Sequence, residues 1–410
     1  MTLGTDDNLK LTKTPPPARL LDLTRSLRRV GRTATGVDRV ELAYLSHLLS
    51  LDTPLYGLAR TALGYVLLDR AGVETFHHRV HNKVAWGRAD LLSRLPRGRS
   101  NAVMRAESDL RRVALQRCLP GRLEAMLRQS LPQGFAYLNL GHSNLTDRVL
   151  SAVKTTGGRI SVMVHDVIPL EYPAFQRSGT VAPFRAKIDR VSLFADLVIY
   201  NSQDTQRRSE AQMHRRLPPA IAAHLGVDVP SPDATALPPG LPPARPYVIY
   251  VGTIEPRKNH SFLLDLWQEM GRGAPMLLIC GNRGWNNAAV FDRLDHLPPD
   301  ALVHEYNGLS DPALAALVAG AAGAVFPSHA EGFGLPPAEA LSLGTRVLCN
   351  DLPVLREVLG DKAVYAPLSD PYSWETTVKE WAANPPDPRS TATFQAPTWA
   401  EHFKTVLKLT

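Results

Sequence analysis

HAEGFGLPPAEALSLGTRVL, residues 329–348, joins a predicted buried strand that ends at Ser328 to a helix that opens near Pro336. Proline suits the first turn of a helix, because its missing N–H would have no partner there. The two glycines just before it let the backbone turn tightly and leave free N–H groups at the positive end of the helix, which favours phosphate oxygens. The sequence therefore predicts a phosphate-binding turn, with donors at Gly332, Phe333, Gly334 and Leu335.

Two glutamates flank this turn. Glu331 lies in the loop and Glu339 lies eight residues later, inside the helix. Both can face one pocket, and carboxylates are good acceptors for vicinal diols, so Glu331 could reach sugar hydroxyls and Glu339 ribose hydroxyls. The same spacing also fits a strand–turn–helix corner whose glutamates are solvated.

A second candidate site is VGTIEPRKNHSFLLDLW, residues 251–267. Arg257 and Lys258 start a helix beyond the carboxyl end of a strand, where cations are disfavoured unless an anion binds between them. Arginine can chelate a diphosphate in bidentate fashion and lysine adds a point charge. The alternative is a surface pair that happens to fall there, but ligands commonly bind at the carboxyl ends of parallel strands.

Strand candidates alternate with helical segments in both halves, which indicates an α/β fold with parallel sheets. The stretch 229–246 between the halves holds seven prolines and predicts a linker. Segment 55–130 has helical character, with one strand candidate at 65–69. The predicted strands are 19–23, 136–141, 159–167 and 196–202 in the first half, and 246–253, 275–281, 301–308, 323–328, 345–351 and 363–367 in the second.

The bulk composition agrees with two globular domains. The chain has 410 residues, more than one hydrophobic core usually serves, and is 44% hydrophobic and 21% charged. Its three cysteines, Cys118, Cys280 and Cys349, have no paired spacing, which excludes a disulfide framework and a zinc ribbon and suits a reducing cytosol. The first residues lack the apolar core of a signal peptide, and the longest apolar run, 313–326, is too short to span a bilayer. We expect a cytoplasmic protein.

The two motifs resemble glycosyltransferase family 4, retaining enzymes with the two-domain GT-B architecture. The resemblance rests on EGFGLPPAE and on the upstream loop from Gly252 to Asn259, and it extends to the segment around Asn282 and the turn 350–353. It implies two Rossmann-like domains facing each other across a cleft. The implied parts are an acceptor-side domain at 16–228, the linker, a donor-binding domain at 247–384, and a terminal helix at 397–410 that crosses back to the first domain.

The first half resembles the same family more loosely. HDVIPLEYP, 165–173, is similar to a segment whose histidine points at the donor sugar, which implies His165 and Asp166 as active-site residues. Without the resemblance, a structural histidine at a strand end is the simpler interpretation. The stretch from Gly31 to Arg39 resembles the glycine-containing loop that faces the donor phosphate, which implies Gly36 as a donor-site residue, together with Gly252 and Asn282.

The implied reaction is transfer of a sugar from a nucleoside-diphosphate sugar to an acceptor hydroxyl, with retention at the anomeric carbon. Arg257, Lys258 and the turn amides would stabilise the leaving diphosphate, so no metal and no further cofactor is expected. The form of HDVIPLEYP resembles bacterial mannosyl and related transferases of surface polysaccharides, which favours GDP-mannose as the donor; UDP and ADP sugars stay open.

Positive charge is concentrated in one segment, since residues 60–128 hold 14 Lys and Arg against 6 Asp and Glu. Such a patch suits an anionic acceptor, for example a lipid-linked glycan, or an anionic membrane at the inner face of the plasma membrane. A solvated arginine-rich insertion is an equally good interpretation. The segment lacks interleaved aromatic residues, so a nucleic-acid partner is not expected.

Two other functions stay open at this stage. A sugar-nucleotide epimerase or hydrolase can use the same architecture, but it needs further acid–base carboxylates in the cleft. A non-catalytic scaffold could dock on membranes through the basic segment, although Arg257, Lys258, Glu331 and Glu339 are all present. Assays with a donor sugar, with and without an acceptor, distinguish these functions.

Overall fold

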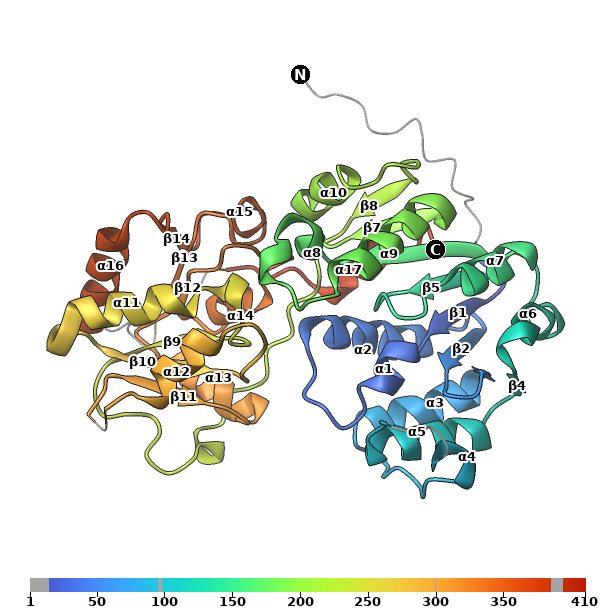
Figure 1. Ribbon diagram of the computed structural model, residues 1–410, viewed down its shortest axis with the longest axis horizontal. Helices are drawn as coiled ribbons and strands as arrows, with labels where there is room; N and C mark the ends of the chain where they lie inside the picture. Colours follow the sequence, from blue (N-terminus) through green and yellow to red (C-terminus); the bar gives the residue numbers. More distant parts are fainter. Residues whose placement is uncertain (1–14, 95–97, 299, 385–393) are drawn as a thin grey trace.

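The computed structural model describes residues 15–94, 98–298, 300–384 and 394–410. They form two α/β lobes, an N-terminal lobe in blue and green and a C-terminal lobe in yellow to red (Figure 1). Helix α17 (Trp399–Val406), at the end of the chain, lies where the lobes meet (Figure 1).

An eight-stranded sheet forms the centre of the N-terminal domain, in the order β4-β3-β2-β1-β5-β6-β7-β8. Strands β1, β2 and β5 to β8 pair in parallel, as the strand–helix alternation predicts. The strands are β1 (Arg19–Asp22), β2 (Leu55–Arg60), β3 (Tyr65–Leu68), β4 (Gln116–Cys118), β5 (Ala136–Asn139), β6 (Arg159–Val164), β7 (Leu197–Tyr200) and β8 (Ala220–Ala222). The helices are α1 (Thr24–Arg28), α2 (Gly36–Leu49), α3 (Arg70–Val80), α4 (Leu91–Arg94), α5 (Asn101–Arg112), α6 (Leu123–Ser130), α7 (Asp147–Thr155), α8 (Ile168–Glu171), α9 (Val181–Phe194) and α10 (Gln203–Glu210).

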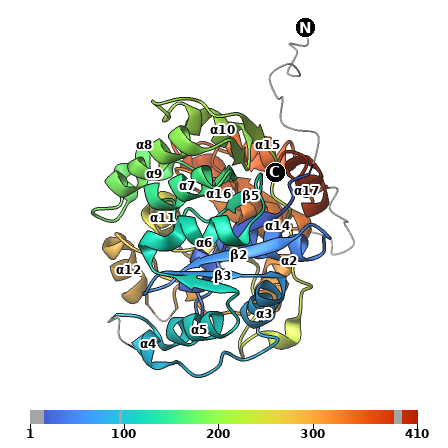
Figure 2. The same ribbon diagram turned by 90° about the vertical axis from the view of Figure 1, so that its right-hand side faces the viewer.

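The segment 55–130 departs from the sequence prediction. The strand candidate at 65–69 is confirmed as β3, but β2 and β4 were not predicted, and β3 and β4 run antiparallel at the edge of the sheet. Helices α3, α4 and α5 gather at one end of this domain (Figure 2). The N-terminal sheet is therefore mixed rather than purely parallel.

Several arginines of the basic segment form ion pairs with carboxylates of the same segment. Arg79 pairs with the buried Asp109 at 2.8 Å, Arg111 with Asp90 at 2.5 Å, and Arg99 with the buried Glu107. These ion pairs tie the chain around α4 to α5. They favour the structural interpretation of this segment over that of an open cationic surface.

The C-terminal domain has a six-stranded, fully parallel sheet in the order β11-β10-β9-β12-β13-β14. The four inner strands, β10, β9, β12 and β13, are apolar along their length because helices cover both faces, whereas the edge strand β11 carries His304 and Glu305. The strands are β9 (Tyr247–Val251), β10 (Met276–Cys280), β11 (Val303–Tyr306), β12 (Gly323–Phe326), β13 (Val347–Cys349) and β14 (Val364–Tyr365). The helices are α11 (His260–Met270), α12 (Ala288–Asp295), α13 (Asp311–Gly320), α14 (Leu335–Ser342), α15 (Pro353–Leu359) and α16 (Pro371–Ala383).

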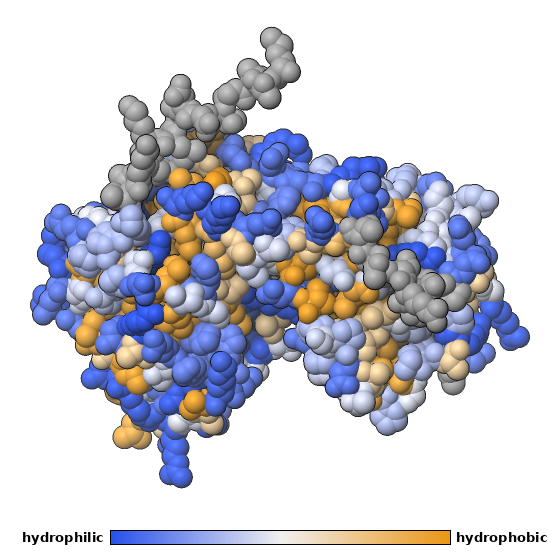
Figure 3. Space-filling view, turned by 180° about the vertical axis from the view of Figure 1, so that it is seen from behind, coloured by the Kyte–Doolittle hydropathy of each residue, from blue (hydrophilic) through white to orange (hydrophobic). Residues whose placement is uncertain are grey.

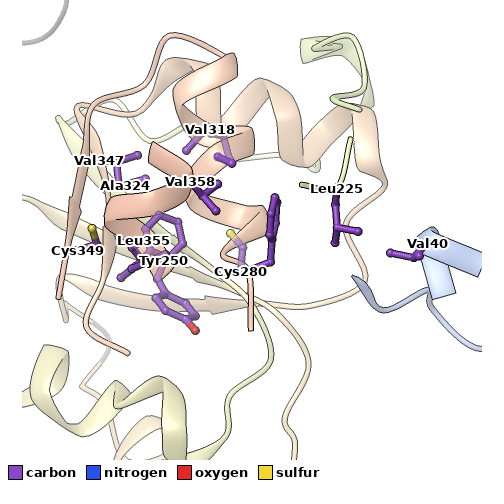
Figure 4. Packing of buried hydrophobic residues seen from close by; sticks show 14 of the residues in the cluster. Val40, Leu225, Tyr250, Cys280, Val318, Ala324, Val347, Cys349, Leu355 and Val358 are labelled. Atoms are coloured by element: carbon purple, nitrogen blue, oxygen red, sulfur yellow. The ribbon is translucent and has the colours of Figure 1, made fainter. Parts of the chain in front are cut away.

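Strand side chains and helix side chains share one core in this domain. Tyr250 of β9 and Ala324 of β12 are fully buried, and Leu355 and Val358 of α15 pack in the same cluster (Figure 4). This packing fixes the loops that leave the carboxyl ends of β9 and β12. Those loops carry the two motifs of the sequence analysis.

Helix α17 binds the N-terminal domain. His402 accepts a hydrogen bond from the Tyr44 hydroxyl at 2.7 Å and donates through Nδ1 to the carbonyl of His224 at 3.0 Å. Arg19 donates to the carbonyl of Thr410 at 3.0 Å. The end of the chain is thus fastened to β1 and α2. Among the described residues, none of the helices combines the length and the hydropathy that a membrane-spanning segment needs.

Candidate active site

Each sheet has one point at which its strand order reverses, and the candidate residues lie there. In the C-terminal sheet the reversal falls between β9 and β12, and in the N-terminal sheet between β1 and β5. Loops after neighbouring strands diverge at such a point, which leaves a crevice for a ligand. The space-filling view shows a hollow between the two lobes (Figure 3).

Arg257 and Lys258 follow β9 and converge on Glu331, which follows β12. Arg257 Nη1 lies 2.9 Å from Glu331 Oε2, and Lys258 Nζ lies 2.5 Å from Oε1. The Ser328 hydroxyl donates to the same carboxylate at 2.6 Å, and Arg257 Nε pairs with Glu255 at 2.7 Å. The anion between the two cations is therefore a carboxylate of the chain itself.

Both oxygens of Glu331 are bound within the chain, and the side chain is 6% exposed. Its contact with sugar hydroxyls stays a prediction. Lys258 is 7% exposed and Arg257 is 23% exposed, so Arg257 offers the larger cationic surface to a ligand. Burial would raise the pKa of Glu331, but Lys258 and Arg257 outweigh it and lower this pKa to about 2. The carboxylate is charged at neutral pH.

The low pKa of Glu331 predicts that the free energy of unfolding depends on pH. A carboxyl whose pKa falls from 4.5 to about 2 on folding stabilises the fold above pH 4.5, and this stabilisation is lost as the pH falls toward 2. It amounts to roughly 3 kcal/mol at pH 7. Urea unfolding of the wild type and of Glu331→Gln at pH 7, 5, 4 and 3 should show a difference in unfolding free energy that shrinks with acid. A difference that stays constant from pH 7 to pH 3 would contradict this assignment.

The predicted phosphate-binding turn lies directly beside the cation cluster. Arg257 Nη1 donates to the carbonyl of Ala330 at 2.9 Å, one residue before Glu331. Helix α14 begins at Leu335 after Gly334 in the left-handed conformation, with prolines in its first turn. Among the described residues, the N–H groups of the turn donate to no protein acceptor; they are those of Gly332, Phe333, Gly334 and Leu335.

Gly332 also brings His165 and Asp166 of the N-terminal domain into the site. A Cβ atom at position 332 would lie 2.8 Å from the His165 carbonyl and 3.2 Å from the Asp166 Cβ. Thr205 and Arg208 of α10 hold the same turn, donating to the carbonyls of Gly332 at 2.9 Å and Glu331 at 3.1 Å. The two domains therefore meet backbone to backbone at this glycine.

Gly332→Ala should disturb this junction. The methyl group faces backbone that cannot rotate away, so we expect the unfolding free energy to fall by about 1–3 kcal/mol. Gly273→Ala is the matched control, because nothing lies within 4 Å of its added Cβ, and it should shift stability by less than about 0.5 kcal/mol. Urea unfolding measures both. Equal changes in unfolding free energy for the two variants would show that the backbone of the two domains is not in close contact at Gly332.

His165 is buried, and its ring is fixed by the backbone. Nε2 lies 2.6 Å from the Leu140 carbonyl, which can only accept, so Nε2 carries the proton and Nδ1 does not. Burial lowers the pKa of His165, so the ring is neutral at physiological pH. Asn201 donates to the His165 carbonyl at 2.9 Å and holds the loop in place.

Glu339 binds a residue of the opposite domain. Arg39 of α2 donates to its carboxylate at 2.7 Å and lies 3.8 Å from Asp311. A cavity of about 770 Å³ opens here between the domains, lined by Leu335 and these three side chains among others. Gly36 lies at its edge, since a Cβ there would be 3.2 Å from Leu335. The sequence analysis did not single out Arg39, although it lies one turn after Gly36.

Comparisons with a family model and with solved structures identify the fold of this chain. Residues 238–393 match the family model of glycosyl transferases group 1. The Anabaena protein Alr3699/HepE, solved with UDP and glucose, has a TM-score of 0.58 at 14% identity, covering 95% of this chain and 98% of that one. The chain has the GT-B glycosyltransferase fold. Sucrose-phosphate synthase from Thermosynechococcus elongatus shares it, with a TM-score of 0.52, 17% identity, and coverage of 65% of this chain and 68% of that one.

Curated relatives of this GT-B chain are mannosyltransferases. The serotype-specific mannosyltransferase WbdA of Escherichia coli is 29% identical over 255 residues, which are 57% of this chain and 31% of the relative. The O-antigen chain mannosyltransferase B of Escherichia coli is 35% identical over 127 residues, 30% of this chain and 33% of the relative. The matches therefore span about a third of the length of these relatives.

Not every residue predicted to bind the donor contacts the cluster formed by Arg257, Lys258 and Glu331. Gly252 and Gly281 approach closely, because a Cβ on Gly281 would lie 1.9 Å from the Gly252 carbonyl, and this contact positions the loop after β9. Asn282 is exposed, and in the described part of the chain its side chain forms no hydrogen bond with Arg257 or Glu331. Its role as a donor residue stays a prediction.

A further ion cluster, absent from the sequence analysis, clamps the two GT-B domains. Glu357 of α15 accepts from the backbone N–H groups of Gln203 and Asp204 at 2.7 and 2.9 Å, at the positive end of α10. It also binds His224 at 2.9 Å. This contact sets the distance between α10, which holds the 331–332 turn, and the donor-side domain. Among the described residues, no group of three or more His, Cys, Asp or Glu side chains is placed to hold a metal ion.

Proposed function

We propose that this protein is a retaining glycosyltransferase that moves mannose or a related hexose from a nucleoside-diphosphate sugar to a hydroxyl of a glycan or lipid-linked acceptor. The observation that carries the proposal is the contact between Arg257 and the 330–335 turn at the C-terminal switch point. A guanidinium and unpaired turn amides side by side suit a diphosphate. The mannosyltransferase relatives support mannose as the sugar and, through the O-antigen enzyme among them, a role in surface polysaccharide synthesis. GDP-mannose as the donor is part of the proposal.

In this mechanism the bond between the anomeric carbon and the phosphate oxygen breaks, and its electron pair goes to the leaving diphosphate. The acceptor oxygen bonds to the anomeric carbon from the same face, and its proton passes to that diphosphate. Arg257 and the turn amides stabilise the growing negative charge, in place of a metal ion. Lys258 and Glu331 orient Arg257 and the turn, and Glu339 accepts from the ribose hydroxyls once Arg39 releases it.

The neutral His165 contributes position and hydrogen bonding. Its unprotonated Nδ1 can accept a hydrogen bond from a hydroxyl of the donor sugar, while the hydrogen bond from Nε2 to the Leu140 carbonyl fixes the ring. Closure of the two domains over the donor excludes water, which protects the activated sugar from hydrolysis.

A nucleotide screen tests the proposal. We expect GDP to raise the thermal midpoint more than UDP, ADP or dTDP, and the corresponding sugar nucleotide to be consumed only when an acceptor is present. If consumption without acceptor releases free sugar at the same rate, the protein is a hydrolase. If none of the four nucleotides raises the midpoint, the proposed donor site is wrong.

A further inference from the structure

A second cavity, of about 320 Å³, lies in the N-terminal domain at the other switch point, after β1 and β5. It is bounded by α1, by the loop that follows β5, and by α9. The lining residues used here are Arg28, His142, Asn144, Thr146, Lys187 and Arg190. It belongs to neither the Arg257 cluster nor the cavity at Glu339.

The walls of this cavity carry an excess of positive charge. Arg190 pairs with Asp147 at 2.8 Å, and that carboxylate is 67% exposed. The side chains of Arg28 and Lys187 have no ion pair or hydrogen bond in the described parts of the chain. This contrasts with Arg79, whose charge is met by a buried carboxylate.

The charged groups closest to Lys187 in effect are arginines. Burial lowers the pKa of its ammonium, and the nearby Arg25, Arg28 and Arg190 lower it further. Three positive charges against one exposed carboxylate leave an excess of two. A phosphate ester or a diphosphate would balance this excess, whereas a single carboxylate would leave half of it.

The cavity adjoins the proposed transfer site. The ring centroid of His142, which lines it, lies 5.7 Å from that of His165. His142 Nε2 lies 2.8 Å from the Met163 carbonyl and so donates to it, which leaves Nδ1 unprotonated. From His165 the path continues to Gly332 and the donor-side turn. A group bound in the cavity therefore sits on the acceptor side of the reacting centre.

We propose that this cavity binds a phosphate or diphosphate group of the acceptor through Arg28, Lys187 and Arg190. The inference rests on the proposed function and specifies its acceptor as phosphorylated. The group could belong to a lipid-linked diphosphate or to a soluble phosphorylated glycan, since both present the same oxygens.

The test is a calorimetric titration of the protein saturated with the nucleoside diphosphate that stabilises it most, so that the Arg257 site is occupied. The probes are inorganic pyrophosphate, farnesyl diphosphate and glucuronate. They are titrated into the wild type, Arg28→Gln and Lys187→Gln. Lys83→Gln serves as the control, because it removes one exposed charge outside the cavity.

We expect pyrophosphate to bind the wild type and Lys83→Gln equally, and to bind Arg28→Gln and Lys187→Gln at least 10-fold more weakly. Tighter binding of farnesyl diphosphate than of pyrophosphate, with the same dependence on Arg28 and Lys187, would identify a lipid-linked source; equal binding would identify a soluble one. Unchanged pyrophosphate affinity in both cavity variants, or tighter binding of glucuronate, would overturn the inference. The thermal shift with the nucleotide alone, measured on the same samples, reports separately on the donor site.

Discussion

Lys258→Met is expected to lower the free energy of unfolding by about 3–5 kcal/mol, the usual cost of removing one partner from a buried ion pair. The Glu331 carboxylate would keep Arg257 and Ser328 but lose the ammonium 2.5 Å from its Oε1. Methionine fills a similar volume, so the effect comes from the uncompensated charge rather than from a cavity. Urea unfolding followed by circular dichroism measures it.

A double variant and a surface variant make this test specific. Lys258→Met with Glu331→Gln should be more stable than Lys258→Met alone, because the second change removes the stranded charge. Lys379→Met breaks a half-exposed pair with Glu375 and should cost about 0.5 kcal/mol or less. If Lys258→Met is no more destabilising than Lys379→Met, the buried cluster does not stabilise the fold.

Arg257→Gln is expected to reduce the transfer rate by about 10²- to 10³-fold, the range found when one preorganised donor to a developing negative charge is removed. Thr205 and Arg208 still donate to the carbonyls of Gly332 and Glu331, so the turn should keep its shape. Since Arg257 is more exposed than Lys258, its loss should disturb stability less and catalysis more. The measurement is the initial rate with the sugar nucleotide whose nucleotide gives the largest thermal shift.

Arg283→Gln is the matched control for this variant. Arg283 lies in the neighbouring loop of the same domain and pairs with Glu305 and Asp295 at 2.7 Å. Its removal changes the net charge equally but touches none of the cluster, so the rate should stay within about 2-fold of the wild type. Equal losses in both variants would mean that the effect is one of overall charge.

The C-terminal domain was readable from the sequence because its signals are local. Its inner strands β9, β10, β12 and β13 are unbroken apolar runs, since helices cover both faces of the sheet, and α14 is marked by glycine before it and proline in its first turn. The fold class and the phosphate-binding turn follow from these signals. The two cations were recognisable because their position at a helix start is electrostatically unfavourable without a partner.

The parts that were missed depend on contacts between distant residues. Strand β4 is three residues long and partly exposed, so Gln116–Cys118 has no hydrophobic pattern to read. Glu331, the partner of Arg257 and Lys258, lies 73 residues downstream of Lys258. Sequence alone does not show that these residues form ion pairs with one another. Arg39 and Glu339 are 300 residues apart and meet only because the domains face each other.

The N-terminal arginines show the same limit. The sequence predicts a basic surface over 60–128, but Arg79 and Arg99 pair with buried carboxylates and Arg111 pairs with the partly buried Asp90. Other cations of the segment, such as Lys83 and Arg117, stay exposed and have no ion pair among the described residues, so the predicted contact with an anionic surface stays a prediction. The cavity at Arg28 and Lys187 draws on α1 and α9, which lie outside the segment, so charge counted along the chain does not reveal it.

A crystal structure with the stabilising nucleoside diphosphate tests the central claim most directly. The account predicts phosphate oxygens within hydrogen-bond distance of the Arg257 guanidinium and of at least one backbone N–H between Gly332 and Leu335, with the ribose at Glu339. A nucleotide whose phosphates lie away from both, with Arg257 still bound only to Glu331, Glu255 and the Ala330 carbonyl, would contradict it.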